Sequence, residues 1–178
     1  EDFYKHTCGA ELGAVLDTLE YLASTDVWFE LTTLLIPGMN DGDEELHAMT
    51  SWVVEHLGPD VPMHFTAFHP DYRMLDRPPT PPATLTRARG IALANGVRYA
   101  YTGNVRDVDG GSTRCHACGE LAIERDGYTI GRYRLDDTGH GGTWMGGMYD
   151  LTSPGPSYMR SAGHLGWAFS AGLGAQCA

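Results

Sequence analysis

The residues of this sequence most suited to chemistry are a cysteine pair and two histidines. Cys115 and Cys118 form a CxxC motif, and two thiolates at this spacing are half of a tetrahedral zinc site. A zinc ribbon needs a second ligand pair after the hairpin that follows, but residues 139–142 read Gly-His-Gly-Gly. We therefore expect the two cysteines to lie close together, as half of a zinc site that holds no metal. His64 and His69 lie in and directly after a β-rich run, which suggests a metal hydrolase as one alternative.

A second group of candidates follows the β-rich run from Trp28 to Ile36. Pro37 and Gly38 end this run, because proline has no N–H for a strand ladder and glycine allows a sharp change of direction. Asn40 then offers turn and cap chemistry before a helix. Ligands of parallel α/β folds bind at the carboxyl ends of the strands, so residues 37–41 lie where a site is expected. A simple strand-to-helix turn explains the segment equally well.

Polar residues within the predicted strands form a third group. Glu30 and Thr32 fall on one face by period-two alternation, and His64 and Thr66 share one face of the next strand. Tyr101 is the corresponding candidate of a third strand. We predict that these side chains line the inside of a barrel, although ordinary strand polarity accounts for any single one of them.

Helical patterns and β-rich runs alternate along the chain and would position these residues. The helices are expected at 9–23, 43–57 and 81–95. The strands are expected at 28–36, 62–68 and 97–102. Because no hairpin connects the strands and each connection has the length of a helix, the order predicts a parallel sheet with right-handed crossovers and its helices on one side.

Three local features refine this α/β prediction. Apolar residues recur at helical spacing in the first helix and predict a buried stripe at Leu12, Val15, Leu16, Leu19 and Leu22. Thr80 is predicted to cap the third helix. The proline-dense loop at 69–82 is expected to be semi-rigid and functional, since long loops in compact domains usually are.

Composition limits the function classes. The chain has 178 residues and a net charge of −11, which argues against a nucleic-acid backbone as partner. No apolar run is long enough to cross a bilayer, no signal peptide is apparent, and four cysteines do not make a disulfide framework. We therefore expect a cytoplasmic protein with no membrane or nucleic-acid partner. Because the first residue is Glu1, we also expect a piece of a longer protein.

The chain divides by composition into three parts. Residues 1–105 carry the alternating pattern, and residues 106–138 hold the CxxC motif and a hairpin from Leu121 to Leu135 that turns at Asp126-Gly127. Residues 139–178 are rich in glycine, poor in charge and without periodicity. This last part is expected to be a disordered tail.

Four stretches resemble the later part of a radical S-adenosylmethionine (SAM) enzyme. They read VWFELTTLLIPGMND (27–41), HFTAFHPDYRMLDRPPTPPATL (64–85), RYAYTGNV (98–105) and STRCHACG (112–119). In this order they are similar to the AmmeMemoRadiSam-system radical SAM enzymes, which are related to the pyruvate formate-lyase-activating enzymes. The resemblance covers residues 2 to about 138 and implies the C-terminal half of a partial (β/α)6 barrel.

The resemblance also implies cofactors and roles for residues. The family binds SAM and a 4Fe-4S cluster, whose CxxxCxxC motif would lie early in the full-length protein, since these four cysteines do not have that spacing. Ile36, Pro37 and Gly38 would lie near the adenine, Thr32 would line the barrel, and His69 would lie near the methionine part. Relatives end with a second CxxC that is not found here. This chain alone is therefore expected to be inactive.

Three functional hypotheses follow. The first is a fragment of a radical SAM enzyme that forms a 5′-deoxyadenosyl radical and acts on an unknown protein or small molecule. The second is a zinc-ribbon binding module on an α/β scaffold. The third, a metal hydrolase using His64 and His69, lacks the Asp or Glu that such sites usually show at another strand end.

Overall fold

The computed structural model describes residues 2–134. The predicted tail at 139–178 and the last residue of the predicted hairpin, Leu135, lie outside this range. The chain divides into two compact units, residues 1–100 and 101–178, and each is described by itself. This division falls a few residues before the boundary at 105 that composition predicts.

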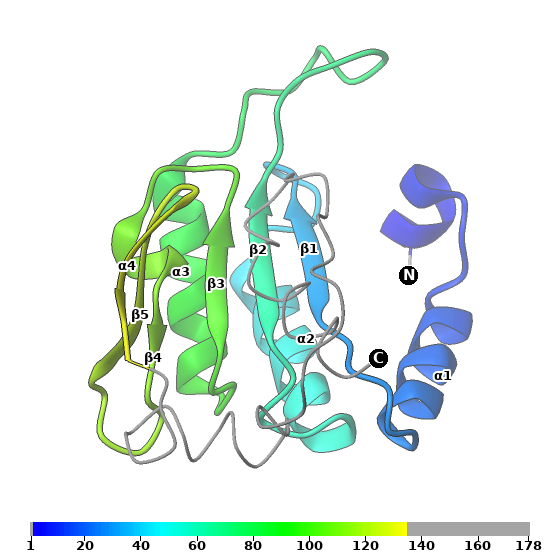
Figure 1. Ribbon diagram of the computed structural model, residues 1–178. Coiled ribbons are helices and arrows are strands. Elements are labelled where there is room, and N and C mark those ends of the chain that lie inside the picture. Colours follow the sequence, from blue (N-terminus) through cyan, green and yellow to red (C-terminus); the bar gives the residue numbers. More distant parts are fainter. Residues whose placement is uncertain (1, 135–178) are drawn as a thin grey trace, which may run out of the picture. The chain divides into compact units, whose positions relative to one another are not determined.

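The predicted parallel sheet is confirmed. Its strands are β1 (Leu31–Leu35), β2 (Met63–Ala67) and β3 (Ala100–Gly103), in the order β1-β2-β3 (Figure 1). β1 and β2 are parallel, with Thr32 beside His64 and Leu34 beside Thr66. The three strands do not close into a barrel. Each strand starts later than predicted, because the residues before it, which include Pro62 before β2 and a bend at Arg98 before β3, are not part of the strand.

Two helices pack on one face of β1 and β2. They are α2 (Asp43–His56) and α3 (Pro82–Ala94), which contact each other behind the sheet in Figure 1. The first turn of α2 carries acidic residues that complement the helix dipole. The Thr33 hydroxyl donates to the Met49 sulfur of α2 at 3.7 Å, so Thr33 marks the helix-facing side of β1. The core on this side consists of buried residues: Leu35, Leu46, Val53, Phe65, Leu85, Ala88 and Ala92.

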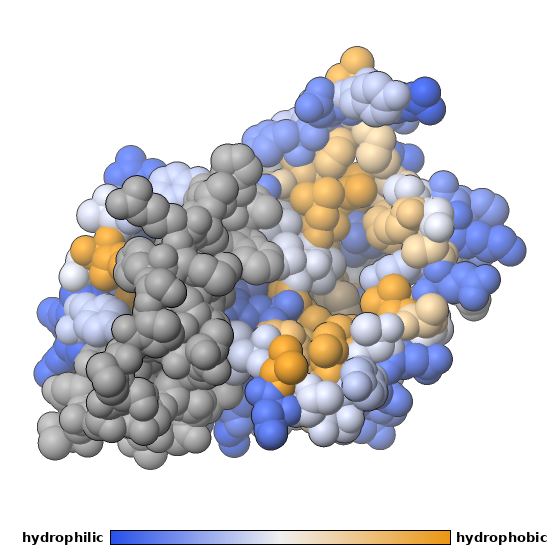
Figure 2. Space-filling view, turned by 45° about the vertical axis from the view of Figure 1, so that its right-hand side comes forward, coloured by the Kyte–Doolittle hydropathy of each residue, from blue (hydrophilic) through white to orange (hydrophobic). Residues whose placement is uncertain are grey.

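The first helix differs from its prediction. α1 (Leu12–Ala23) begins three residues late and is preceded by a π-helical segment, η1 (Tyr4–Cys8). Gly9, in the left-handed region with φ of 65°, ends η1. The predicted burial of the apolar stripe is wrong, since no residue of α1 is buried. Figure 2, in which the α1 side is turned forward, shows apolar residues at the surface among hydrophilic ones.

Thr80 also has a different role from the predicted helix cap. The N-cap of α3 is Pro81, without a side-chain cap hydrogen bond. Thr80 is buried, and its hydroxyl donates to the Leu35 carbonyl at 2.5 Å and accepts from the Phe68 N–H at 2.9 Å. The prediction failed because the Leu35 carbonyl at the end of β1, which is distant in sequence, lies within hydrogen-bonding distance of this hydroxyl.

The second unit is built from a short helix and an antiparallel sheet. The helix is α4 (Val108–Gly111), and the strands are β4 (Thr113–Arg114), β5 (Leu121–Asp126) and β6 (Thr129–Tyr133). Asp107 caps α4 by accepting from the Gly110 N–H at 2.9 Å. The predicted hairpin is confirmed as far as Tyr133: Asp126 pairs with Thr129, and Gly127 has a positive φ of 58°.

Candidate functional site

The turn after β1 is held by the side chain of Asn40. Its Oδ1 accepts from the Ile36 N–H at 2.7 Å, and its Nδ2 donates to the Leu34 carbonyl at 2.9 Å. Asn40 is 7% exposed and Ile36 is 4% exposed. The amide therefore satisfies backbone groups where the strand ladder ends. Asn40 and Ile36 thus shape the turn, and their burial limits direct contact with a ligand.

Gly38 and Pro37 present the exposed part of this turn. Gly38 is exposed and adopts a φ of 72°, which favours glycine, and its N–H donates to the Asp41 carboxylate at 2.7 Å. A Cβ at Gly38 would meet only the Arg77 guanidinium, at 3.9 Å. That guanidinium donates to the Pro37 carbonyl at 3.3 Å. The space next to the Gly38 Cα is therefore open, and the Arg77 guanidinium lies at its border.

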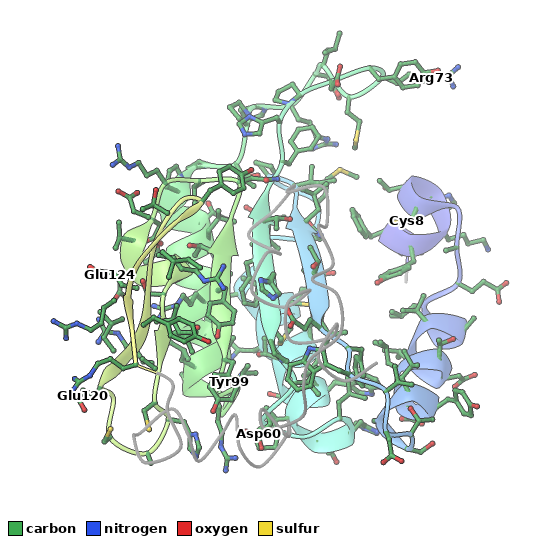
Figure 3. All side chains as sticks on the ribbon, in the orientation of Figure 1. Cys8, Asp60, Arg73, Tyr99, Glu120 and Glu124 are labelled. Atoms are coloured by element: carbon green, nitrogen blue, oxygen red, sulfur yellow. The ribbon has the colours of Figure 1, made fainter. Side chains whose placement is uncertain are left out.

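The proline-dense loop at 69–82 begins at the carboxyl end of β2 and returns to the end of β1. Through Thr80 the end of the loop bonds to Leu35 of β1 and to Phe68, directly before the exposed His69. His69 therefore directly follows the end of β2, which the Thr80 hydroxyl connects to the end of β1. Figure 3 shows Arg73 at the tip of this loop, beyond the strand ends, and its guanidinium lies 5.1 Å from the ring centroid of Tyr72.

Polar residues lie on the face of β1 and β2 that points away from α2 and α3. Because Thr33 faces α2, alternation places Thr32 on the opposite face, next to its partner His64. Thr32 is exposed, and Thr66, two residues beyond His64 on the same face, is buried. The predicted grouping of these residues on one face therefore agrees with the strand register.

Glu30 and His64 form a close pair on this face. The His64 Nε2 lies 2.7 Å from the Glu30 Oε2, and the side chains are only 11% and 8% exposed. The other carboxylate oxygen, Oε1, accepts from the Trp28 indole N–H at 3.0 Å. A buried carboxylate is costly unless its oxygens are paired, and here both oxygens have donors. Tyr101, the remaining candidate of this group, belongs to the second unit, where its hydroxyl lies 3.0 Å from the Thr113 hydroxyl.

The CxxC motif forms a tight turn. The Gly119 N–H donates to the Cys115 carbonyl at 2.8 Å, and the Cys115 N–H donates to the Glu120 carbonyl at 2.9 Å. Burial acts to raise the pKa of the Cys115 thiol, but hydrogen bonds from the backbone of Cys118 and Ala117 and from the Cys118 side chain bring this pKa below its usual value. Backbone donors aimed at a cysteine sulfur favour the thiolate, which is the form that binds metals.

The residues present fit the implied cofactors only in part. Cys115 and Cys118 are the closely spaced thiols of residues 2–134, and no group of three or more metal-ligating side chains occurs among these residues. Residues 2–134 therefore provide no 4Fe-4S ligand set. For SAM, the exposed Thr32, Gly38 and His69 are available at the strands and their carboxyl ends.

The geometry of the two histidines disfavours the hydrolase alternative. His64 is the second residue of β2, and its Nε2 lies 2.7 Å from the Glu30 carboxylate, whereas the exposed His69 follows the end of the strand. A zinc site usually needs at least three protein ligands. Among residues 2–134, neither histidine belongs to a group of three or more metal-ligating side chains.

Three contributors to this region were not identified from the sequence as site residues. The Trp28 indole donates to the Glu30 carboxylate, and the Arg77 guanidinium donates to the Pro37 carbonyl. The Thr80 hydroxyl connects the ends of β1 and β2. The spacing of Trp28 and Glu30 was a usable signal, because residues two apart in extended chain share a face. Thr80 and Arg77 gave no such signal, because their partners are about 40 residues away.

Comparison with known proteins gives one informative relative. No family model matches the chain. Uncharacterized protein MJ0808 of Methanocaldococcus jannaschii is 44% identical over 124 residues, which cover 70% of this chain and 37% of that protein. The matched part thus spans little more than a third of the relative's length. Among residues 2–134, no helix has the length and apolarity needed to cross a membrane.

Proposed function

We propose that this chain is the later part of a radical SAM enzyme whose cluster ligands come from a part of the full-length protein outside this sequence. One observation carries the proposal: parallel β1 and β2 are tied at their carboxyl ends, covered by α2 and α3 on one face, and lined with polar residues on the other. An open parallel sheet of this kind can bind a ligand across its strand ends. The match to 37% of a longer archaeal protein is consistent with a larger enzyme.

The residues of this chain would bind and orient the cofactor and the substrate. When bound, SAM and a 4Fe-4S cluster supply a 5′-deoxyadenosyl radical that abstracts hydrogen from a substrate. Thr32, Gly38 and His69 would contact SAM directly, since they are exposed on the strands or at their ends. Ile36 and Asn40 would hold the turn in shape, and Pro37 would border the adenine. Glu30, His64, Thr66 and Tyr101 remain the proposed substrate-side residues.

The proposed setting follows from charge and composition. A net charge of −11 disfavours nucleic acid as the substrate. We propose a cytoplasmic enzyme acting on a small molecule or a protein, because the four cysteines of the sequence do not make the disulfide framework that is typical of oxidising compartments.

Anaerobic reconstitution tests this proposal. The full-length archaeal relative and this chain are each incubated with iron and sulfide, then with SAM and dithionite, and 5′-deoxyadenosine is quantified by chromatography. We expect product from the relative, none from this chain, and none from either without dithionite. A full-length relative that forms no four-iron chromophore would overturn the proposed class.

The CxxC turn supports a second candidate, a zinc-ribbon binding module. Its supporting observation is the set of backbone donors to the Cys115 sulfur, which would stabilise a metal-bound thiolate. A structural zinc site needs four ligands, and Cys115 and Cys118 are two. Native mass spectrometry with added zinc distinguishes the candidates: one tightly bound zinc that is lost in Cys115→Ser would favour the ribbon, whereas absence of bound zinc would exclude it for this chain.

A further inference from the structure

Cys115 and Cys118 lie in a turn whose two ends are held by the sheet of the second unit. β4 ends directly before Cys115, β5 begins directly after Glu120, and the two strands are antiparallel partners. Within the turn, the Cys115 N–H donates to the Glu120 carbonyl at 2.9 Å, and the Gly119 N–H donates back to the Cys115 carbonyl at 2.8 Å. The backbone that carries the two cysteines is therefore closed by hydrogen bonds at both ends.

This closed turn brings the two sulfurs together. The side chain of Cys118 makes a hydrogen bond to the Cys115 sulfur. In tight turns, Cα atoms three residues apart lie within about 7 Å of each other, and the Cα atoms of a disulfide are about 4.4–6.8 Å apart. The turn therefore holds the two cysteines close to the separation that an S–S bond needs, without any rearrangement of the strands.

The pair is open to reagents from solution. Cys118 is exposed, Cys115 is partly exposed, and all residues from 116 to 120 are exposed as well. Buried structural cysteines are inert, whereas accessible ones react. A disulfide at an exposed position is also open to attack by thiols, which makes it labile. A bond between these two sulfurs is therefore expected to form and to break again under mild conditions.

Two neighbouring thiols are sufficient for this chemistry. A structural zinc site needs four ligands, but a disulfide needs only the pair that the turn supplies. In a reducing compartment, disulfides are usually transient and have catalytic or redox-sensing roles. A CxxC motif in a cytosolic chain with alternating strands and helices is typical of such redox chemistry.

We propose that Cys115 and Cys118 form a reversible dithiol–disulfide pair that exchanges with disulfides in solution. One cysteine thiolate attacks a sulfur of a small-molecule disulfide, whose S–S bond breaks and releases one half as a thiolate. The second cysteine thiolate attacks the resulting mixed disulfide, forms the Cys115–Cys118 bond and releases the other half. The chain loses two electrons and two protons, and the small disulfide gains them as two thiols. This redox site lies beyond the proposed function and does not depend on it.

A glutathione titration of the full chain tests the pair directly. The chain is equilibrated, with a chelator present, in mixtures of reduced and oxidised glutathione, and is then quenched with acid, alkylated and mapped by mass spectrometry. Cys8 is the internal control, since it is exposed and has no other cysteine within a hundred residues of sequence. We expect the peptide with Cys115 and Cys118 to lose two hydrogens and add no glutathione, while Cys8 adds one glutathione.

Three results of this titration would overturn the proposal. The first is a glutathione adduct that persists on Cys115 or Cys118 in the unaltered chain. The second is an unchanged Cys115–Cys118 peptide in mixtures that modify Cys8. The third is a bond from either cysteine of the pair to Cys8 or Cys177. The expected disulfide must also return to two free thiols when dithiothreitol is added.

Serine variants separate the two steps of the exchange. Cys118→Ser and Cys115→Ser each leave one thiol, and each should accumulate the mixed glutathione disulfide, because no second thiol is present to displace glutathione. Cys8→Ser is the matched control and should leave the midpoint of the pair unchanged. Absence of a trapped adduct in both single variants, in mixtures that oxidise the unaltered pair, would contradict the stepwise exchange.

The same titration in urea tests whether the folded turn holds the pair. A disulfide that fits the folded turn is stabilised by folding, so unfolding should move its midpoint toward more oxidising mixtures. An equal midpoint in the folded and the unfolded chain would show that the turn does not bring the thiols together. None of these measurements needs SAM, iron or zinc, so failure of the redox pair and failure of the proposed enzyme class are distinguishable.

Discussion

The Thr80 hydroxyl donates to the Leu35 carbonyl at 2.5 Å, across 45 residues of sequence. The same hydroxyl accepts from the Phe68 N–H at 2.9 Å, and both contacts are buried. One side chain therefore satisfies the last backbone groups of two parallel strands at the edge where a ligand is expected. The loop between β2 and α3 returns to this edge through the same residue.

Replacing this hydroxyl should destabilise the first unit. Thr80→Val keeps the shape of the side chain but leaves two buried backbone groups without their partner, at about 1–3 kcal/mol for each group. We expect a lower urea midpoint and faster hydrogen exchange of the Phe68 amide. Thr80→Ser retains the hydroxyl and should preserve the protection of this amide. Unchanged exchange in Thr80→Val would show that the hydroxyl does not hold the strand ends.

Asn40 should behave as a structural residue. Asn40→Ala removes the acceptor of the Ile36 N–H and the donor to the Leu34 carbonyl, and should cost about 1–3 kcal/mol of unfolding free energy. Asn40→Asp keeps the acceptor and loses the donor, so its stability should lie between those of the alanine variant and the original chain. Urea titration of the three proteins gives the order. An aspartate variant less stable than the alanine variant would contradict this assignment.

Gly38 and Gly90 should respond in opposite directions to alanine. Gly38 has a φ of 72°, and a Cβ there meets no atom closer than 3.9 Å, so Gly38→Ala should cost about 1–2 kcal/mol through backbone strain alone. Gly90 is exposed within α3 with nothing near its Cβ position. Gly90→Ala should therefore stabilise by about 0.5–1 kcal/mol through helix propensity. Thermal denaturation compares the two, and equal signs would refute the backbone argument.

Cys115 should react with iodoacetamide at lower pH than free cysteine does. Burial raises the pKa of this thiol, but the hydrogen bonds from Cys118 and Ala117 outweigh it and lower the pKa. Stability linked to this group is accordingly present above the unfolded-state pKa and is lost as the pH falls through the folded-state value. Peptide mapping of alkylation against pH measures the midpoint. Cys118→Ser replaces the thiol donor and keeps the backbone donors, so the midpoint should stay below that of a cysteine peptide; a midpoint at or above that of free cysteine would contradict the prediction.

Much of the scaffold could be predicted from local patterns. The alternation of helical and β-rich segments determined that the strands are parallel, because connections of helix length permit no hairpin. The Asp126-Gly127 turn determined the hairpin of β5 and β6, since a positive φ at Gly127 suits a tight connection. Period-two alternation likewise placed Glu30 with Thr32 on one face of the first strand, and His64 with Thr66 on one face of the second. These features depend on residues that are near neighbours in sequence.

The remaining features depend on which distant groups meet. The apolar stripe of α1 is a property of its sequence, but its burial needs a partner surface, and no residue of α1 is buried. Threonine is a residue type that often caps helices. The Thr80 hydroxyl nevertheless donates to the Leu35 carbonyl, because this carbonyl lies beside it at the end of β1. Glu30 and His64 form a pair only because the crossover sets β1 and β2 in register. Sequence alone thus determined the elements and their faces, whereas tertiary structure decided the partners, because a hydrogen bond needs its two atoms within about 3 Å and local periodicity does not specify distances between segments.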